Sequence, residues 1–296
     1  MLKIKFKYEH QWSKNLRLFY AKKYRLLFLN LMMMKISFSK YQGAGNDFIM
    51  VDNRDLAFNH HYPHKIAKLC DRRFGVGADG IMFLEPAEGF DFKMVYYNSD
   101  GQPSSMCGNG GRCIVAFAKQ LGIIKDETTF LAVDGPHYAK ISSSGDWVSL
   151  QMIDVDVINK DGEAYVINTG SPHYVKFDLA VADKNVFEEG RAIRYNETYK
   201  TEGININFVE EMEDHLLVRT YERGVEDETY ACGTGVTAVA LANAIAKNQI
   251  GKIETPIKVL GGELNIKFEY DGKKFSHIFL EGPAVRVFDG DIALSL

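Results

Sequence analysis

Two of the four cysteines, Cys107 and Cys232, stand in glycine-rich contexts that could support acid–base chemistry. The segment Cys107–Gly110 reads C-G-N-G and the segment Cys232–Gly235 reads C-G-T-G. Each leads into a predicted helix, whose first turn offers unpaired N–H groups and about half a positive charge. We expect this setting to hold a substrate carboxylate on main-chain donors and to lower the pKa of each thiol below about 8.5.

A pair of such cysteines facing one cleft would solve a stereochemical problem. One thiolate removes a proton from one face of an α-carbon while the other thiol donates a proton to the opposite face, so the configuration inverts. The two thiols exchange protonation states in the return direction and titrate as a coupled pair. The alternative is a small buried hydrophobe, the usual fate of a free cysteine, and we expect it for Cys70 and Cys113.

A helix start cannot supply this activation alone. Its field contributes at most about 2 kcal/mol, or roughly 1.5 pK units, which is small against the weak acidity of an amino-acid α-proton. The cysteines therefore require a closed, water-poor site in which fixed N–H donors stabilise the charge that develops on the carboxylate.

The elements that must position these cysteines repeat along the chain. Residue numbers 107 and 232 differ by 125, and so do those of Asn46 and Ser171, each of which follows a glycine and precedes a β-rich run. Between these anchors, the runs Lys93–Asn98 and Val218–Arg223 match as well. One offset serving two pairs of anchors indicates a duplication and two similar domains related by a pseudo-twofold axis.

The local patterns predict a mixed α/β fold. Helices are expected over Arg112–Leu121 and Val236–Lys247. The second is apolar nearly all round and the segment Ile114–Ala118 of the first is similar, so each is expected to be a buried helix. A weaker helix is expected over His64–Cys70. Strands are expected over Ile36–Lys40, Phe48–Asp52, Lys93–Tyr97, Trp147–Ile153, Tyr165–Asn168, Leu216–Tyr221 and Ile257–Leu260.

We therefore predict two pseudo-symmetric domains, each a curled mixed β-sheet around one central buried helix. The first domain spans residues 34–151 and takes up the final strand, 282–296, and it carries Cys107. The second domain spans 152–281 and carries Cys232. The inter-domain cleft is the expected binding site, because small-molecule sites favour domain interfaces.

The amino-acid composition excludes several classes of protein. With 46% hydrophobic and 25% charged residues the chain is an ordinary soluble protein, not a disordered or polytopic membrane protein. A formal charge of −4 gives no reason to expect nucleic acid as a partner. Four cysteines are too few for a disulfide scaffold and fit a reducing cytoplasm, and no histidine cluster completes a metal site. The sequence leaves the oligomeric state open, a homodimer included.

Residues 1–33 differ from the rest, with eight Lys or Arg against one acidic residue. Their apolar run, Leu26–Met34, is too short and interrupted for a good signal peptide, and it lacks a small-residue cleavage site. A membrane-surface helix would need a cleaner amphipathic pattern. We expect an upstream extension outside the fold, with translation starting at Met32, Met33 or Met34.

Three motifs in order resemble the signatures of diaminopimelate epimerases. They are Gly43–Phe48 (G-A-G-N-D-F), Asn98–Gly101 leading to Met106–Arg112 (M-C-G-N-G-G-R), and Tyr221–Gly224 leading to Ala231–Gly235 (A-C-G-T-G). The resemblance runs from about Met34 to the C-terminus. It implies conversion of LL- to meso-diaminopimelate in lysine and peptidoglycan synthesis, with no pyridoxal phosphate and no metal.

The resemblance also implies roles for individual residues. Cys107 and Cys232 would be the two acid/base residues, and Glu222 would help bind the distal ammonium. Asn98, Asn205 and Arg223 would bind the distal carboxylate, for which the planar fork of arginine is suited. The remaining expected substrate-binding residues are Asn46, Gly108, Asn109, Ser171, Gly233 and Thr234. Taken singly, each polar residue could instead be an ordinary loop or turn residue.

Two positions depart from the family pattern. Many members have Asn where this chain has Ser171, so a bridging water could replace a direct contact with the substrate. Some members have a pocket Gln where this chain has Gly80, so no side-chain contact is expected there. His173 could be a pocket residue or a hydrogen-bonded core histidine, and we favour the second interpretation.

Three other functions compete with this interpretation. A proline or hydroxyproline racemase would use a similar cysteine pair, but the Glu222–Arg223 pair fits a substrate with a second charged end. An amino-acid-binding module would have no need of two thiols. A thiol redox protein would form a disulfide between Cys107 and Cys232 as its working state.

Overall fold

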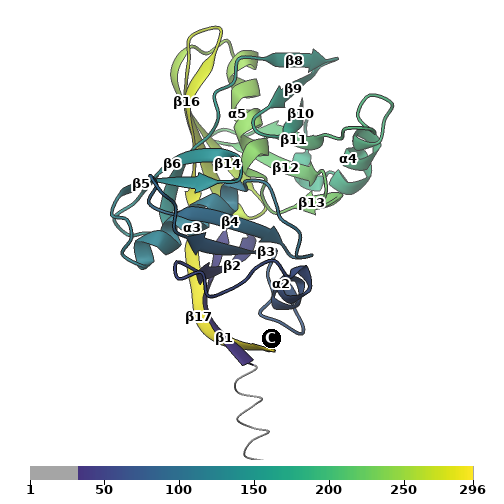
Figure 1. Ribbon diagram of the computed structural model, residues 1–296. Coiled ribbons are helices and arrows are strands. Elements are labelled where there is room, and N and C mark those ends of the chain that lie inside the picture. Colours follow the sequence, from purple (N-terminus) through teal and green to yellow (C-terminus); the bar gives the residue numbers. More distant parts are fainter. Residues whose placement is uncertain (1–32, 296) are drawn as a thin grey trace, which may run out of the picture. The chain divides into compact units, whose positions relative to one another are not determined.

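The computed structural model describes residues 33–295, and Figure 1 shows it as a ribbon. Contacts divide the chain into two compact units. The described part of the smaller unit comprises 33–38 and 290–295, where Asp291 accepts a hydrogen bond from Ser37 at 2.6 Å and pairs with Lys35 at 2.9 Å. The larger unit is Ser39–Asp289 and contains both cysteine motifs. The predicted extension, residues 1–33, lies outside the described residues except for Met33, the first residue of β1.

The elements follow one another in two similar series. The first series is β1 (Met33–Gly43), β2 (Asn46–Asp52), α2 (Pro63–Cys70), β3 (Gly80–Glu85), β4 (Lys93–Asn98), α3 (Gly108–Gln120), β5 (Glu127–Ala132), β6 (Gly135–Ile141) and β7 (Trp147–Gln151). The second series is β8 (Ile158–Asp161), β9 (Ala164–Asn168), β10 (Pro172–Phe177), the 3₁₀ turn η1 (Val181–Asp183), α4 (Val186–Arg194), β11 (Asn205–Glu211), β12 (Leu216–Glu222), β13 (Asp227–Thr229), α5 (Gly233–Ala246), β14 (Gly251–Val259), β15 (Gly262–Tyr270), β16 (Phe275–Pro283) and β17 (Val285–Ser295).

The strand registers repeat the offset found in the sequence. The parallel pair β2–β3 joins Phe48 to Gly80, and the parallel pair β10–β11 joins His173 to Asn205, so both partners are displaced by 125 residues. Each pair continues into an antiparallel neighbour, β4 or β12. The duplication predicted from glycine-rich motifs therefore extends to the backbone hydrogen-bond ladders.

One predicted match is displaced by a residue. Ile81 pairs with Tyr97, whereas Ile206 pairs with Tyr221, so the offset on this last strand is 124. The expected match of Lys93–Asn98 with Val218–Arg223 is wrong in this respect. In the ladder, the counterpart of Asn98 is Glu222, and the loop before the second cysteine is one residue longer than the loop before the first.

Each helix that follows a cysteine is wrapped by the strands of its own series. Helix α3 is buried from Gly108 to Ala118 and packs among side chains such as Phe48, Met82, Phe130 and Leu150. Helix α5 has alanine or another apolar residue on every side, and strands β9 to β11 and β14 to β16 pack against it (Figure 1). Burial of an apolar helix on all faces provides the core of each half, as predicted.

The strands pair in both parallel and antiparallel fashion, and strands β7 and β16 join the two halves. These strands are antiparallel, with Leu150 opposite Leu280. Strand β1 pairs with both β2 and β17. Over residues 33–295 the seventeen strands are thus linked in one mixed hydrogen-bonded network. The fold has two pseudo-symmetric domains, each a curled sheet around a helix.

Candidate active site

Cys107 and Cys232 are the N-cap residues of α3 and α5 and have almost the same backbone conformation. Both have φ of −115°, with ψ of 120° at Cys107 and 110° at Cys232. The helices begin four and three residues earlier than predicted, at Gly108 and Gly233, because their glycines hide the helical pattern. The cysteines therefore border the first-turn N–H groups more closely than the sequence indicated.

The two helix starts meet at these glycines. A Cβ built on Gly233 would lie 3.4 Å from the Cα of Gly108, and one built on Gly108 would lie 3.6 Å from the Cα of Gly233. Either Cβ would approach Cδ2 of the buried Leu280 to 2.8 Å, which is closer than real contacts allow. The absence of side chains at both positions therefore lets the N-termini of α3 and α5 converge on one point, with a cysteine on each side.

The expected lowering of the cysteine pKa values is wrong. Burial raises the pKa of both Cys107 and Cys232. The carboxylate of Glu222 raises both further, because a negative charge disfavours a thiolate. Both thiols are therefore protonated at neutral pH.

Main-chain donors act in the expected direction but are outweighed by burial. The N–H groups of Gly110 and Asn109 lower the pKa of Cys107, and the N–H group of Gly235 lowers that of Cys232. These groups lie within the first turns, where the helix itself provides no acceptor. They are available to an anion placed between the two helices.

Asn109 links the two halves beside Cys107. Its Nδ2 donates to Oδ1 of Asn46 at 2.5 Å and to the carbonyl oxygen of Ala231 at 3.0 Å. Its Oδ1 accepts from Nη2 of Arg112 at 2.9 Å. Asn46 in turn donates to a carboxylate oxygen of Asp79 at 3.1 Å. The Asn109 carboxamide is thus fixed at both ends, and it ties the start of α3 to the residue before Cys232.

The equivalent contact is present beside Cys232. The hydroxyl groups of Thr234 and Ser171 lie 3.1 Å apart, and their residue numbers exceed those of Asn109 and Asn46 by 125. The Thr234 hydroxyl also lies 3.5 Å from Sγ of Cys232 and 2.9 Å from Nε2 of His173. The pseudo-symmetry therefore includes side-chain contacts of the site.

His173 is fully buried and joins this group. The Oδ1 of Asn207 accepts from the Thr220 hydroxyl at 3.0 Å, which turns the Asn207 amide nitrogen toward Nδ1 of His173 at 3.2 Å. Nδ1 is then the acceptor, and Nε2 carries the proton that faces Thr234. Burial, assisted by the charge of Arg223, lowers the pKa of His173 to about 3, so the ring is neutral. The histidine is hydrogen-bonded in the core, as favoured, and it also borders the site.

Asn205 connects Ser171 to Arg223. Its Nδ2 donates to the Ser171 hydroxyl at 3.2 Å, and its Oδ1 accepts from the main-chain N–H of Arg223 at 2.9 Å. One guanidinium nitrogen of Arg223 donates to the carbonyl oxygen of Glu202 at 2.9 Å. The Arg223 side chain is otherwise exposed. The structure thus brings three expected binding residues together at the ends of β10, β11 and β12.

Glu222 and Asn98 occupy equivalent ends of β12 and β4. The Glu222 carboxylate accepts from the Thr229 hydroxyl at 2.8 Å, and burial raises its pKa. Asn98 lies opposite Gly80 in the ladder. A Cβ at Gly80 would come within 2.5 Å of Cε2 of Tyr96, so the tyrosine ring occupies the space of any side chain there.

The other two cysteines are buried, as predicted for small hydrophobic residues. Cys70 and Cys113 are buried, and burial raises the pKa of each thiol to about 12. All four cysteines are free, so the disulfide expected for a redox protein is not formed.

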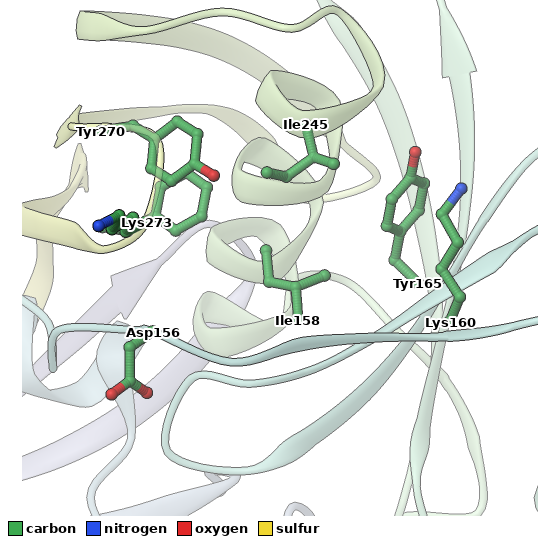
Figure 2. Close-up of a pocket in the computed structure, with 8 residues that line it drawn as sticks. Asp156, Ile158, Lys160, Tyr165, Ile245, Tyr270 and Lys273 are labelled. Carbon is green, nitrogen blue, oxygen red and sulfur yellow. The ribbon is translucent and has the colours of Figure 1, made fainter.

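A surface pocket lies away from the cysteines. Figure 2 shows this pocket, of about 210 Å³, with Ile158, Tyr165 and Ile245 among its lining residues. Ile245 is near the C-terminal end of α5, whereas Cys232 precedes its first residue. At a rise of about 1.5 Å per residue, the length of the helix separates the two sites by roughly 20 Å.

Residues 33–295 contain no group of three or more His, Cys, Asp or Glu side chains placed to hold a metal ion. Within the same residues, no helix is long and apolar enough to cross a membrane.

Comparison with known proteins places this geometry among epimerases. The family pattern named diaminopimelate epimerase matches residues 38–158 and 165–287. A diaminopimelate epimerase from Flavobacterium psychrophilum is 52% identical over 255 residues, which covers 86% of this chain and 98% of the relative.

Solved structures share the fold at low sequence identity. A Bacillus anthracis phenazine biosynthesis protein of the PhzF family aligns with a TM-score of 0.69 and 15% identity, covering 88% of this chain and all of that chain. A hydroxyproline epimerase from Agrobacterium vitis, with bound trans-4-hydroxy-L-proline, aligns with a TM-score of 0.64 and 13% identity, covering 89% and 93%.

Proposed function

The chain belongs to the diaminopimelate epimerase family, and from that premise we propose that it interconverts LL- and meso-diaminopimelate by direct proton transfer at one α-carbon. It is an isomerase. The observation that carries the proposal is the meeting of the α3 and α5 N-termini at Gly108 and Gly233, with a cysteine at each helix start.

In the proposed reaction the two cysteines act on opposite faces. One of the two thiols, Cys107 or Cys232, first loses its proton to solvent. The resulting thiolate takes the α-proton while the other thiol gives its proton to the opposite face of the carbanion. The thiolate and thiol have then exchanged places, which prepares the site for the reverse direction. Both groups must work from fixed positions, because misplacement by about 1 Å can reduce the rate 10²-fold.

The carboxylate next to the reacting carbon binds the first-turn N–H groups of both helices. The backbone at Gly108, Asn109, Gly233 and Thr234 supplies donors without intrahelical partners, and glycine permits close approach. These donors stabilise the charge that passes onto the carboxylate as the proton leaves. The Asn46–Asn109 and Ser171–Thr234 contacts hold the two donor sets in place.

The distal end of the substrate lies toward β11 and β12. Arg223 and Asn205, with Asn98, bind the distal carboxylate, and Glu222 takes the distal ammonium. The raised pKa of Glu222 reflects the burial of its carboxylate. Within residues 33–295 this carboxylate accepts a hydrogen bond from the Thr229 hydroxyl, and a substrate ammonium would supply a counter-charge. This second charged subsite favours diaminopimelate over a substrate with one charged end.

We further propose that one domain supplies each cysteine, with the domains spanning 34–151 plus 282–296 and 152–281. We also propose that the protein is a homodimer and acts in the cytoplasm. The repeated ladders of β2–β3 and β10–β11 support the division into two similar domains.

The proposal is tested by incubating the purified full chain with LL-diaminopimelate in D₂O under reducing conditions, without added cofactor. We expect meso-diaminopimelate to form with deuterium at the inverted carbon. L-Proline and trans-4-hydroxy-L-proline are the comparison substrates, and inversion of either one but not of diaminopimelate would favour the racemase alternative. Binding without proton exchange would indicate an amino-acid-binding module.

A further inference from the structure

A fully buried arginine lies directly behind the first turn of α3. Arg112 is 0% exposed, and its guanidinium reaches back toward the helix start. Nη2 donates to Oδ1 of Asn109 at 2.9 Å, Nη1 lies 3.4 Å from the carbonyl oxygen of Gly108, and Nε lies 3.4 Å from that of Pro283. All three acceptors are neutral.

Two thiols that can ionise to thiolates act on the charge of Arg112. Cys113 and Cys107 raise its pKa, whereas burial lowers it to about 10, so the guanidinium remains charged at neutral pH. Among residues 33–295, its hydrogen-bond acceptors include no carboxylate. A buried cation without a counter-charge is costly, which leaves room for an anion that forms only during the reaction.

The equivalent position in the second half of the chain carries no charge. The residue 125 positions after Arg112 is Thr237, which is also fully buried. Its hydroxyl donates to the carbonyl oxygen of Gly233 at 2.9 Å, so it caps the same part of the helix without a charge. Gly282 makes room for the arginine, since a Cβ there would lie 3.2 Å from its Nε. The pseudo-symmetric site is therefore electrostatically asymmetric.

Resting on the two-cysteine reaction proposed above, we propose that Arg112 is a positioning residue of the site. It fixes the carboxamide of Asn109 at the start of α3, and its charge favours the thiolate at Cys107 over the thiolate at Cys232.

The other titratable groups around the thiols do not create this asymmetry. Glu222 raises the pKa of both cysteines, and Cys107 raises that of Cys232, a repulsion between two thiolates that acts on whichever thiol ionises second. Tyr96 from β4 and Cys113 from α3 have raised pKa values and are neutral. The charge of Arg112 acts in the opposite direction to that of Glu222, because it lowers the pKa of Cys107.

The test measures the ionisation of each cysteine separately. The full-length protein and its Arg112→Gln and Arg112→Lys variants are alkylated with iodoacetamide from pH 6 to 11, and mass spectrometry of the peptides gives the rate at each cysteine. We expect the parent midpoint for Cys107 to lie below that for Cys232. In Arg112→Gln the Cys107 midpoint should rise by about one pH unit or more and the Cys232 midpoint by less than half as much. The acid limb of the pH profile of kcat/KM should shift in the same direction as the Cys107 midpoint.

Controls separate charge from packing. Arg112→Lys keeps a charge and should return the Cys107 midpoint toward the parent value, whereas Thr237→Val should leave it unchanged. Equal shifts at both cysteines, or a parent midpoint for Cys107 above that for Cys232, would overturn the inference. If circular dichroism shows that Arg112→Gln does not fold, the order of the Cys107 and Cys232 midpoints in the parent protein still tests the inference. Alkylation needs no substrate, so a Cys107-specific shift in a protein without epimerase activity would contradict the proposed function and leave this effect standing.

Discussion

Gly233→Ala tests whether the two helix starts must touch. The added Cβ would lie 2.8 Å from Cδ2 of Leu280, whereas an ordinary contact begins at 3.4 Å, so the gap must open by at least 0.6 Å. Leu280 is fully buried and has little room to turn away. Overpacking of this kind costs about 1–3 kcal/mol of stability. Because the displaced atoms carry Cys232 and its N–H donors, we expect kcat/KM to fall by roughly 10- to 100-fold.

The measurements are kcat/KM for epimerisation and the free energy of unfolding in urea. Gly122→Ala is the matched control, because a Cβ there meets nothing within 4 Å but the residue has φ of +71°. It should lower stability through backbone strain while leaving kcat/KM unchanged. Combining Gly233→Ala with Leu280→Val removes the clashing δ-methyl and should recover part of the activity. A Gly233→Ala enzyme with activity within about twofold of the parent would refute the close approach as a requirement of catalysis.

Further predictions concern single side chains. Arg223→Lys keeps the charge but loses the two-pronged grip on a carboxylate, so kcat/KM for diaminopimelate should fall about thirtyfold, or roughly 2 kcal/mol; unchanged efficiency would place Arg223 outside the site. Glu222→Gln removes a charge that raises both thiol pKa values, so alkylation midpoints at both cysteines should move to lower pH while kcat/KM falls; unmoved midpoints would contradict this effect. Cys70→Ala and Cys113→Ala should retain activity in the steady-state assay and lose at most modest thermal stability, and loss of activity in the folded variants would show that these thiols are needed.

Much of the fold could be predicted because its signals are local and repeated. Glycines that follow a cysteine, and helices without a polar face, are visible without any knowledge of the packing. The predicted boundaries failed where glycine conceals helical structure, at Gly108 and Gly233. Helix α4 was not predicted, because its charged residues leave a weak apolar pattern in a short segment, Val186–Arg194. The one-residue shift at β12 depends on loop length and cannot be read from matching motifs.

The candidate site was predictable in its residue types but not in its electrostatics. Asn46, Asn109, Ser171 and Thr234, which the sequence indicates as site residues, form matching contacts in the two halves. The direction of the thiol pKa shifts was wrong because burial depends on the whole fold, whereas a helix start is visible locally. Neither the hydrogen bonds of His173 nor the absence of a carboxylate partner for Arg112 among residues 33–295 could be inferred from sequence spacing.

The division of labour between Cys107 and Cys232 is tested by changing each to serine. A serine hydroxyl can donate a proton but is a poor base at neutral pH, so each variant should lose most net epimerisation. Elimination of hydrogen halide from a β-halogenated diaminopimelate needs a base on one face only, because the α-proton leaves to the enzyme as the halide departs from the neighbouring carbon.

The decisive measurement is therefore the elimination rate of each serine variant with the two α-epimers of that analogue. If the cysteines serve opposite faces, Cys107→Ser and Cys232→Ser should each eliminate one epimer rapidly and the other slowly, with opposite preferences. The same preference in both variants, or epimerisation near the parent rate in a folded Cys107→Ala or Cys232→Ala variant, would contradict the two-base reaction.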